Sequence, residues 1–192
     1  MKLTRRIDLN LGYTCNLNCR FCYYRQSRDS TDRKQRRDLT TESAKKWLRF
    51  FRSKGLEEVD LTGGEPTIRD DILELITYAR EIGFRTVCVI TNGIRLADNN
   101  FTRRLVENGL NDILFSLHGP DSRLHDRQVG RAGSFEKLLQ AMKNTSEFPL
   151  RRRSNTVVNG LNYTRLPEIA EVLREQGIER INFILFNQVV EA

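Results

Sequence analysis

Short apolar runs and segments with helical spacing alternate along the chain. Runs rich in β-branched and other apolar residues indicate six strands, at 6–11, 58–62, 85–91, 112–117, 155–159 and 180–186. After the first run, Ala44, Trp47, Leu48 and Phe51 recur with the spacing of one buried helix face, so we expect Trp47 in the core. Four later stripes, each lying between two of the apolar runs, predict four more helices, around 72–79, 105–106, 135–142 and 166–173.

Six strands separated by five helices predict an α/β fold with a mainly parallel sheet, because parallel strands need crossover connections and helices supply them. Periodicity alone leaves two architectures open, a doubly wound open sheet and a barrel or partial barrel. In both, ligands gather at the carboxyl ends of the strands. We interpret residues 1–192 as one domain, either minimal or truncated after the sixth strand, since the sequence ends directly after that strand.

The charged residues change this picture little. The stretch 25–38 is polar and has no helical stripe, so we expect a mobile loop there. The net charge of +7 makes an acidic partner conceivable, but the basic clusters at 33–37 and 151–153 lack interleaved aromatic residues. We interpret both clusters as solvated surface, with an RNA substrate as the alternative. No long apolar run or secretory signal is present, so we expect a cytoplasmic protein with no membrane partner.

Three of the four cysteines lie within eight residues, at Cys15, Cys19 and Cys22. In a chain without an export signal, clustered thiols hold metal more often than they form disulfides. Three sulfurs are one short of a closed zinc site, whereas on an iron–sulfur cluster they leave one iron for an outside molecule. Spacing alone leaves both sites open, together with incidental thiols. Cys88 lies inside a strand and is expected to be a small buried residue.

A second motif, Gly63-Gly64-Glu65-Pro66-Thr67, follows the second expected strand. Two glycines after a strand allow the backbone to approach a ligand closely, and their amides and carbonyls become available to it. The negative charge of Glu65 is suited to an ammonium group. Because the carboxyl ends of parallel strands meet at one edge, we expect this turn to lie beside the cysteine loop.

Together these motifs resemble the radical S-adenosylmethionine (SAM) superfamily. The resemblance rests on C-x3-C-x2-C with Phe21 before its last cysteine, and on the Gly-Gly-Glu-Pro turn. Two further landmarks follow in order, Thr91-Asn92-Gly93 after the third strand and Ser116-Leu117-His118-Gly119-Pro120 after the fourth. The resemblance covers about residues 7–186 and implies a partial (β/α)6 barrel like that of a TIM barrel.

The resemblance also implies the cofactors and their ligands. The three cysteines would ligate a [4Fe-4S] cluster, and the amino and carboxylate groups of SAM would bind its fourth iron. The reduced cluster would cleave SAM to methionine and a 5′-deoxyadenosyl radical, which would abstract hydrogen from the substrate. Phe21 would lie beside adenine, and Ser116 would reach the ribose or the carboxylate. The cofactor-binding set is Phe21, Gly63, Gly64, Glu65, Pro66, Asn92, Ser116 and Asn155, with Cys15, Cys19 and Cys22 as metal ligands.

Several positions depart from the family pattern or leave alternatives. His118 stands where many relatives have Asp. His125 and Asp126 are interpreted as a polar pair in a loop, and Arg127 or Arg131 after them is a candidate for the methionyl carboxylate. Asn159 is the alternative to Asn155, and Leu185 or Phe186 is expected to form an apolar wall against adenine.

The hypothesis for function is a radical SAM enzyme with a peptide or protein as substrate, because the fourth-strand motif resembles that of peptide maturases. The resemblance implies an external one-electron donor such as flavodoxin or ferredoxin. No cysteine follows Cys88, so no auxiliary-cluster domain is expected. The alternatives are a zinc-holding module that interacts with RNA or protein, and a non-catalytic fragment of such an enzyme.

Overall fold

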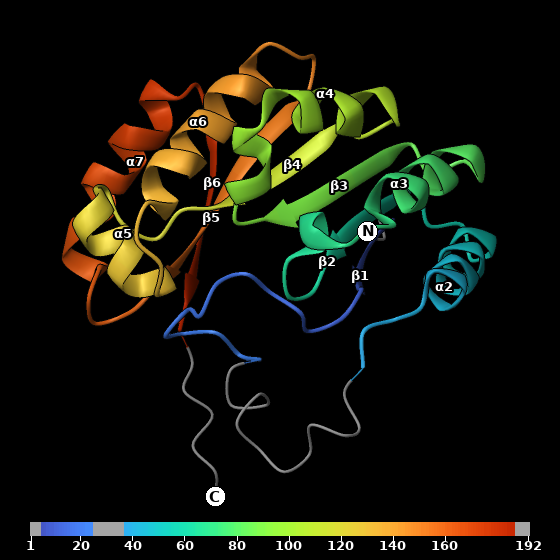
Figure 1. Ribbon diagram of the computed structural model, residues 1–192, viewed down its shortest axis with the longest axis horizontal. Coiled ribbons are helices and arrows are strands. Elements are labelled where there is room, and N and C mark those ends of the chain that lie inside the picture. The colour runs from blue at the N-terminus through green and yellow to red at the C-terminus, as the bar shows by residue number, and fades with distance from the viewer. Residues whose placement is uncertain (1–4, 25–36, 187–192) are drawn as a thin grey trace, which may run out of the picture.

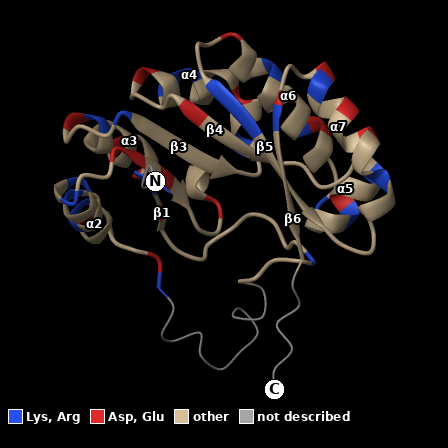
Figure 2. Cartoon of the chain, turned by 180° about the vertical axis from the view of Figure 1, so that it is seen from behind, with Lys and Arg blue, Asp and Glu red and all other residues tan. Residues whose placement is uncertain are grey.

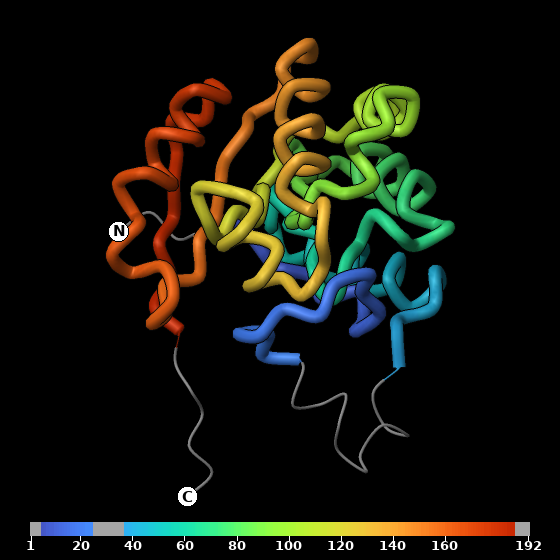
Figure 3. Tube along the Cα trace, turned by 60° about the vertical axis from the view of Figure 1, so that its left-hand side comes forward, coloured from blue at the N-terminus to red at the C-terminus, as the bar shows by residue number. Residues whose placement is uncertain are grey.

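The computed structural model describes residues 5–24 and 37–186, which contain a single six-stranded sheet. All neighbouring strands are parallel and follow the order of the sequence, β1-β2-β3-β4-β5-β6. The sheet curls, and the helices cover its outer side (Figure 1, Figure 3). The expected partial barrel is therefore confirmed. The strands are β1 (Arg6–Asn10), β2 (Glu58–Thr62), β3 (Thr86–Thr91), β4 (Asp112–Ser116), β5 (Arg151–Val158) and β6 (Arg180–Leu185).

The connections between strands contain helices that begin at recognisable caps. The side chains of Thr40, Asp98 and Asp121 each accept a hydrogen bond from a backbone N–H in the first turn of the helix that follows. The helices are α2 (Thr41–Ser53), α3 (Ile72–Glu81), α4 (Asn99–Glu107), α5 (Ser122–Val129), α6 (Ser134–Ser146) and α7 (Leu166–Glu175). Shorter 3-10 turns occur at η2 (Pro66–Ile68), η3 (Ile94–Ala97) and η4 (Tyr163–Arg165).

Helix α5 is the element that the apolar pattern did not predict. The placement of His125 and Asp126 in a loop is wrong, because both lie within this helix. Its inward side carries buried His125 and Gln128 beside Val129, so a scan for apolar stripes finds no periodicity there. The signals that do mark it are the capping Asp121 and the left-handed Gly130 at its end.

The main hydrophobic core lies between the outer face of the sheet and the helices. Strand residues such as Leu61, Val89 and Phe115 are fully buried there against helix residues such as Leu75 and Leu138. The prediction that Trp47 joins this core is wrong, since its exposed fraction is 46%. Trp47 instead stacks on the neighbouring ring of Phe51.

The opposite, concave face of the sheet carries different residues at the amino ends and at the carboxyl ends of its strands. Alternation and register bring Asp60, Cys88 and Asp112 together at the amino ends of the strands. Cys88 is buried, as expected, and burial raises the pKa of its thiol well above the ordinary value. At the carboxyl ends the same face presents the uncharged residues Ser116 and Asn155, which are paired across β4 and β5.

Arginines close the amino end of the barrel, where Figure 2 shows blue residues of β5 beside a red position of β4. The side chain of Asp112 is fully buried and accepts hydrogen bonds from Arg151 at 2.5 Å and Arg153 at 3.0 Å. Arg152 points to the other face, where it donates to the carbonyls of Met142 and Gln176. The interpretation of residues 151–153 as solvated surface is therefore wrong, and β5 begins four residues before its expected start.

Two predictions of the sequence lie largely outside the described residues. These are the loop at 25–38, of which residues 25–36 are not described, and the basic cluster at 33–37. Among the helices of the described residues, none combines the length and the apolar character that crossing a membrane requires.

We predict that Asp112→Asn lowers the free energy of unfolding at pH 7 by about 3 kcal/mol, because partly buried arginines lose their counter-charge. Burial alone would raise the pKa of Asp112, but hydrogen bonds from Arg153 and Arg151 outweigh it and hold that pKa below its ordinary value. The stabilising charge of Asp112 is therefore present at neutral pH and lost as the pH falls. The difference in unfolding free energy between wild type and Asp112→Asn is thus expected to shrink below about pH 4.

Urea unfolding at pH 7 and at acid pH measures this difference. The control is Glu171→Gln, which removes an exposed ion pair with Arg174 and is expected to leave the unfolding free energy unchanged. Equal unfolding free energies for wild type and Asp112→Asn at pH 7 contradict the account.

Candidate active site

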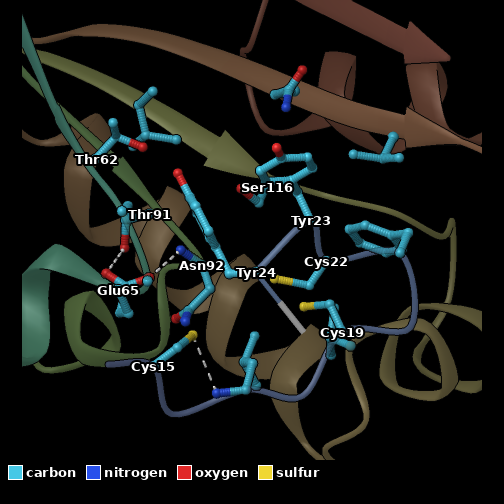
Figure 4. Close-up of a pocket in the computed structure, with 18 of the residues that line it drawn as sticks. Cys15, Cys19, Cys22, Tyr23, Tyr24, Thr62, Glu65, Thr91, Asn92 and Ser116 are labelled. Atoms are coloured by element: carbon cyan, nitrogen blue, oxygen red, sulfur yellow. Dashed lines mark hydrogen bonds between the residues drawn. The ribbon is translucent and has the colours of Figure 1, made fainter. Parts of the chain in front are cut away.

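A cavity of about 300 Å³ opens at the carboxyl ends of the strands (Figure 4). Its lining includes the three cysteines and every member of the expected cofactor-binding set except Pro66. Pro66 is buried behind the cavity as the first residue of η2, where its fixed φ suits the start of a helical turn. The fold thus brings the cysteine loop, the glycine turn and the ends of β3, β4 and β5 to one place.

The three clustered cysteines present their thiols to this cavity from one loop between β1 and α2 (Figure 4). All are thiols rather than disulfides. The loop is folded tightly, with the amide of Leu17 donating to the sulfur of Cys15 at 3.4 Å and the amide of Cys22 donating to the carbonyl of Cys19 at 3.2 Å. A small apolar cluster that includes Leu17 packs against Cys15 and Cys19.

Across residues 5–24 and 37–186, no three or more His, Cys, Asp or Glu side chains are arranged to bind one metal ion. The described residues thus do not form the closed zinc site that the alternative requires. A four-iron cluster spans more space than one ion, so its thiolates stand further apart, and three thiols around one cavity suit it.

The glycine turn after β2 lies directly against the beginning of the cysteine loop. The amide of Gly64 donates to the carbonyl of Gly12 at 2.8 Å, and the amide of Glu65 donates to the carbonyl of Thr14 at 2.9 Å. A Cβ atom on Gly64 would lie 2.1 Å from the Thr14 oxygen, and Gly63 has a φ of +133°. The two glycines are needed for the approach of the chain to itself as well as to a ligand.

The carboxylate of Glu65 is bound within the protein and links the turns after β2 and β3. Its exposed fraction is 3%, and it accepts hydrogen bonds from the hydroxyls of Thr67 and Thr91 and from the amides of Thr67 and Asn92. Burial raises the pKa of Glu65, and these hydrogen bonds oppose the shift. The sequence predicts that the Glu65 carboxylate faces an ammonium group. In the structure this carboxylate is instead hydrogen-bonded to the turn after β3.

Asn92 extends this connection to the cysteine loop. Its side-chain amide donates to the side-chain oxygen of Asn16 at 2.7 Å, and its own oxygen accepts from the amide of Ile94. The side chain of Asn92 is therefore engaged in holding the loop over the strand ends.

Asn155 offers an acceptor to a ligand. Its side-chain oxygen is buried and has no hydrogen-bond partner among the described residues, although the residue lines the cavity. Such an oxygen is costly unless a donor reaches it. Asn159, the alternative, is engaged elsewhere, with its amide donating to Gln128 and its oxygen accepting from Leu161.

His118 forms part of the same wall and is uncharged. Its Nδ1 accepts from the amide of Val157 at 3.2 Å, and its ring meets Phe21 edge to face at 4.4 Å between centroids. Burial, with a smaller contribution from nearby His125, lowers the pKa of His118 well below the ordinary value. With Nδ1 as an acceptor, the neutral ring carries its proton on Nε2.

Other expected contacts are not among the described residues that line the cavity. The guanidinium of Arg131 donates to the carbonyl of Asn16, and Arg127 is likewise absent from the lining. Leu185 is 79% exposed and pairs with Val158. The cavity residue Val157 pairs with Ile184 instead, so alternation places Ile184 on the concave face.

Sequence reasoning missed several residues of the lining, including Thr62 and Ile90. Thr62 and Ile90 lie on the concave face near the ends of β2 and β3, a position that strand alternation could have indicated. The hydroxyl of Tyr24 accepts a hydrogen bond from Asn10 at 2.8 Å, which no local sequence pattern predicts.

Solved structures share this fold over nearly the whole chain. SuiB of Streptococcus suis bound to S-adenosylmethionine superposes with a TM-score of 0.77 at 23% identity, covering 97% of this chain and 42% of that one. Native anSMEcpe with bound AdoMet and the Kp18Cys peptide also gives 0.77, at 16% identity, covering 97% of this chain and 52% of that one.

Curated relatives are more similar in sequence. Fe-coproporphyrin III synthase of Methanosarcina barkeri is 34% identical over 91% of this chain and 42% of its own length. PqqA peptide cyclase of Bradyrhizobium diazoefficiens is 30% identical over 90% of this chain and 44% of its own length. GTP 3′,8-cyclase of Aquifex aeolicus is 27% identical over 98% of this chain and 59% of its own length. The chain thus spans about half the length of these relatives. Residues 9–171 match the family model of the radical SAM superfamily, and with its cysteine loop above the glycine turn the chain belongs to that superfamily.

Proposed function

We propose that this chain is the core of a radical SAM enzyme. Cys15, Cys19 and Cys22 would ligate a [4Fe-4S] cluster, and SAM would bind its remaining iron. When bound and reduced, this pair supplies a 5′-deoxyadenosyl radical that abstracts hydrogen from a substrate. The observation that carries the proposal is the meeting, in one cavity, of three thiols, a glycine turn and the unpartnered oxygen of Asn155.

The residues around the cavity would divide the binding of SAM between them. The backbone of Gly63 and Gly64 would face the methionyl ammonium, and buried Glu65 would fix that backbone through the β3 turn. This support is indirect, since the Glu65 carboxylate already accepts four hydrogen bonds. The placement of the methionyl end at this turn follows from its closeness to the cysteine loop.

The opposite wall suits the uncharged part of SAM. Phe21, Val157 and neutral His118 provide apolar surface, and the side-chain oxygen of Asn155 would accept a hydrogen bond from the adenosyl group. Ser116, which pairs with Asn155 across the sheet, would reach the ribose or the carboxylate.

A peptide or protein is the proposed substrate class. PqqA peptide cyclase is among the relatives in sequence, and two of the structural neighbours, SuiB with precursor peptide SuiA and anSMEcpe with a peptide, were solved as peptide complexes. We further propose that a flavodoxin or ferredoxin in the cytoplasm donates the electron. Comparing 5′-deoxyadenosine formation with and without candidate peptides tests the substrate class.

We predict that anaerobic reconstitution gives a brown protein with about four irons per chain, which forms 5′-deoxyadenosine from SAM and dithionite. Cys19→Ala is expected to lose the colour and the product, because only two thiol ligands remain. Cys88→Ala is the matched control and is expected to retain both, since Cys88 is buried away from the cavity. Stoichiometric zinc without iron would support the interaction module, and iron without 5′-deoxyadenosine would support a non-catalytic fragment.

A second prediction concerns the glycine turn. Gly64→Ala is expected to lower the iron content at least severalfold, because its Cβ would collide with the backbone oxygen of Thr14 and displace the cysteine loop. Gly160→Ala is the control, since a Cβ there meets nothing within 4 Å and neither glycine has a left-handed φ. Iron and sulfide analysis of both reconstituted proteins provides the measurement, and equal iron contents contradict this role for Gly64.

A further inference from the structure

Helix α5 holds the cysteine loop through the backbone at its C-terminal end. The amide of Asn18 donates to the carbonyl of Val129 at 3.0 Å, and the amide of Arg20 donates to the carbonyl of Gln128 at 2.9 Å. These two donors are the residues directly before and after Cys19, the second of the three ligand cysteines. In Figure 3 the yellow segment that contains α5 lies next to the blue loop. The path of the loop is therefore tied to the end of this helix.

The same helix holds the wall of the cavity after β4. Nδ1 of His125 accepts from the amide of His118 at 3.2 Å, and the side-chain amide of Gln128 donates to the carbonyl of His118 at 2.8 Å. Both backbone polar groups of His118 are thus bound by side chains of α5. The side-chain oxygen of Gln128 also accepts from Asn159, which follows β5, at 2.7 Å.

Gln128 is the residue at which these connections meet. It is completely buried, its backbone oxygen binds the cysteine loop, and its side chain binds the segments after β4 and β5. Buried polar groups that are fully hydrogen-bonded favour a single arrangement, because any shift leaves a partner unsatisfied.

Helix α5 is also hydrogen-bonded to the start of helix α6. The carboxylate of Asp126 accepts hydrogen bonds from the amides of Gly133 and Phe135 at 2.7 and 2.9 Å, which joins α5 to the start of α6. Helix α6 packs in the main core through residues such as Leu138. The helix is therefore anchored to the scaffold while it holds the loop and the wall.

Gly130 marks how close the loop and the helix end come. Its φ is +72°, and a Cβ atom there would lie 2.7 Å from the backbone oxygen of Asn18. Gly133 has nearly the same φ, +75°, but a Cβ atom there would meet nothing within 4 Å. The two positions share the conformational need for glycine, and of the two Gly130 is the one in close contact with the cysteine loop.

We propose that α5 positions the cluster relative to SAM: it sets the separation between the cysteine loop and the cavity wall at His118, with Gln128 and Gly130 as positioning residues. This inference rests on the proposed function, because it supposes that the loop holds the cluster and that the wall contacts SAM. Neither Gln128 nor Gly130 lines the cavity, so any effect of their substitution on the cofactors is transmitted through α5.

The decisive experiment compares Gly130→Ala with Gly133→Ala in the reconstituted chain. Both place alanine at positive φ, so both are expected to lower the melting temperature, and Gly130→Ala by more because its Cβ also meets the backbone of Asn18. Only Gly130→Ala is expected to weaken SAM binding about tenfold by calorimetry and to reduce the change that SAM causes in the paramagnetic resonance spectrum of the reduced cluster. Failure of Gly130→Ala alone to load iron equally supports the inference, provided circular dichroism shows a folded protein.

Gln128→Met tests the other side of the helix and decides the matter if Gly130→Ala does not fold. Its backbone carbonyl still binds Arg20, so the iron content is expected to stay at the wild-type level while SAM binding weakens about tenfold. Gln140→Met is the control, because Gln140 lies on α6 and its side chain donates a hydrogen bond to Asn144 of the same helix.

The outcomes separate the inference from the proposed function. If the wild-type chain binds neither iron nor SAM, the proposed function is wrong whatever the variants do. If wild type binds both, but Gly130→Ala matches Gly133→Ala and Gln128→Met matches Gln140→Met in SAM affinity and spectrum, the inference about α5 is wrong and the proposed function stands.

Discussion

The contact between the cysteine loop and the turn after β2 is the constraint on which the site depends. Two backbone hydrogen bonds, from Gly64 to Gly12 and from Glu65 to Thr14, join the segments that would hold the cluster and the methionyl group. The approach is so close that a single methyl group on Gly64 has no room. Since backbone atoms make the contact, its geometry depends on the sheet register rather than on mobile side chains, and a cofactor bound across it meets a preformed surface.

Charge is distributed along the barrel in a way that supports this arrangement. At the amino ends of the strands, buried Asp112 and the arginines around it close the barrel with paired charges. At the carboxyl ends, Glu65 is the one carboxylate that the described residues contribute to the lining, and it accepts hydrogen bonds from the β3 turn. The cavity therefore presents thiols, amides and neutral side chains, which suits a ligand that brings its own charges. In the proposed function, the unpartnered Asn155 oxygen would accept a hydrogen bond from that ligand.

The parallel α/β fold could be predicted because the periodicity of strands and helices is a local signal in the sequence. The closeness of the cysteines to the glycine turn could be predicted because a parallel sheet brings the carboxyl ends of its strands to one edge. Sequence reasoning failed where burial depends on distant partners. Arg151 and Arg153 lie inside the barrel only because Asp112 faces them from β4. Helix α5 buries Gln128 instead of an apolar stripe because its partners are His118 and Asn159. The direction of the Glu65 carboxylate follows from Thr91, which the chain reaches only through another crossover.

In the proposed site, three thiolates leave one iron open for the amino and carboxylate groups of SAM. Electron–nuclear double resonance on the reduced protein with SAM labelled by ¹⁵N at the amino group measures whether that iron binds the amino group. We expect a ¹⁵N coupling to the cluster that is absent when SAM is omitted or unlabelled. Bound SAM without any such coupling, or a cluster whose fourth iron is held by a side chain of this protein, would contradict the proposed site.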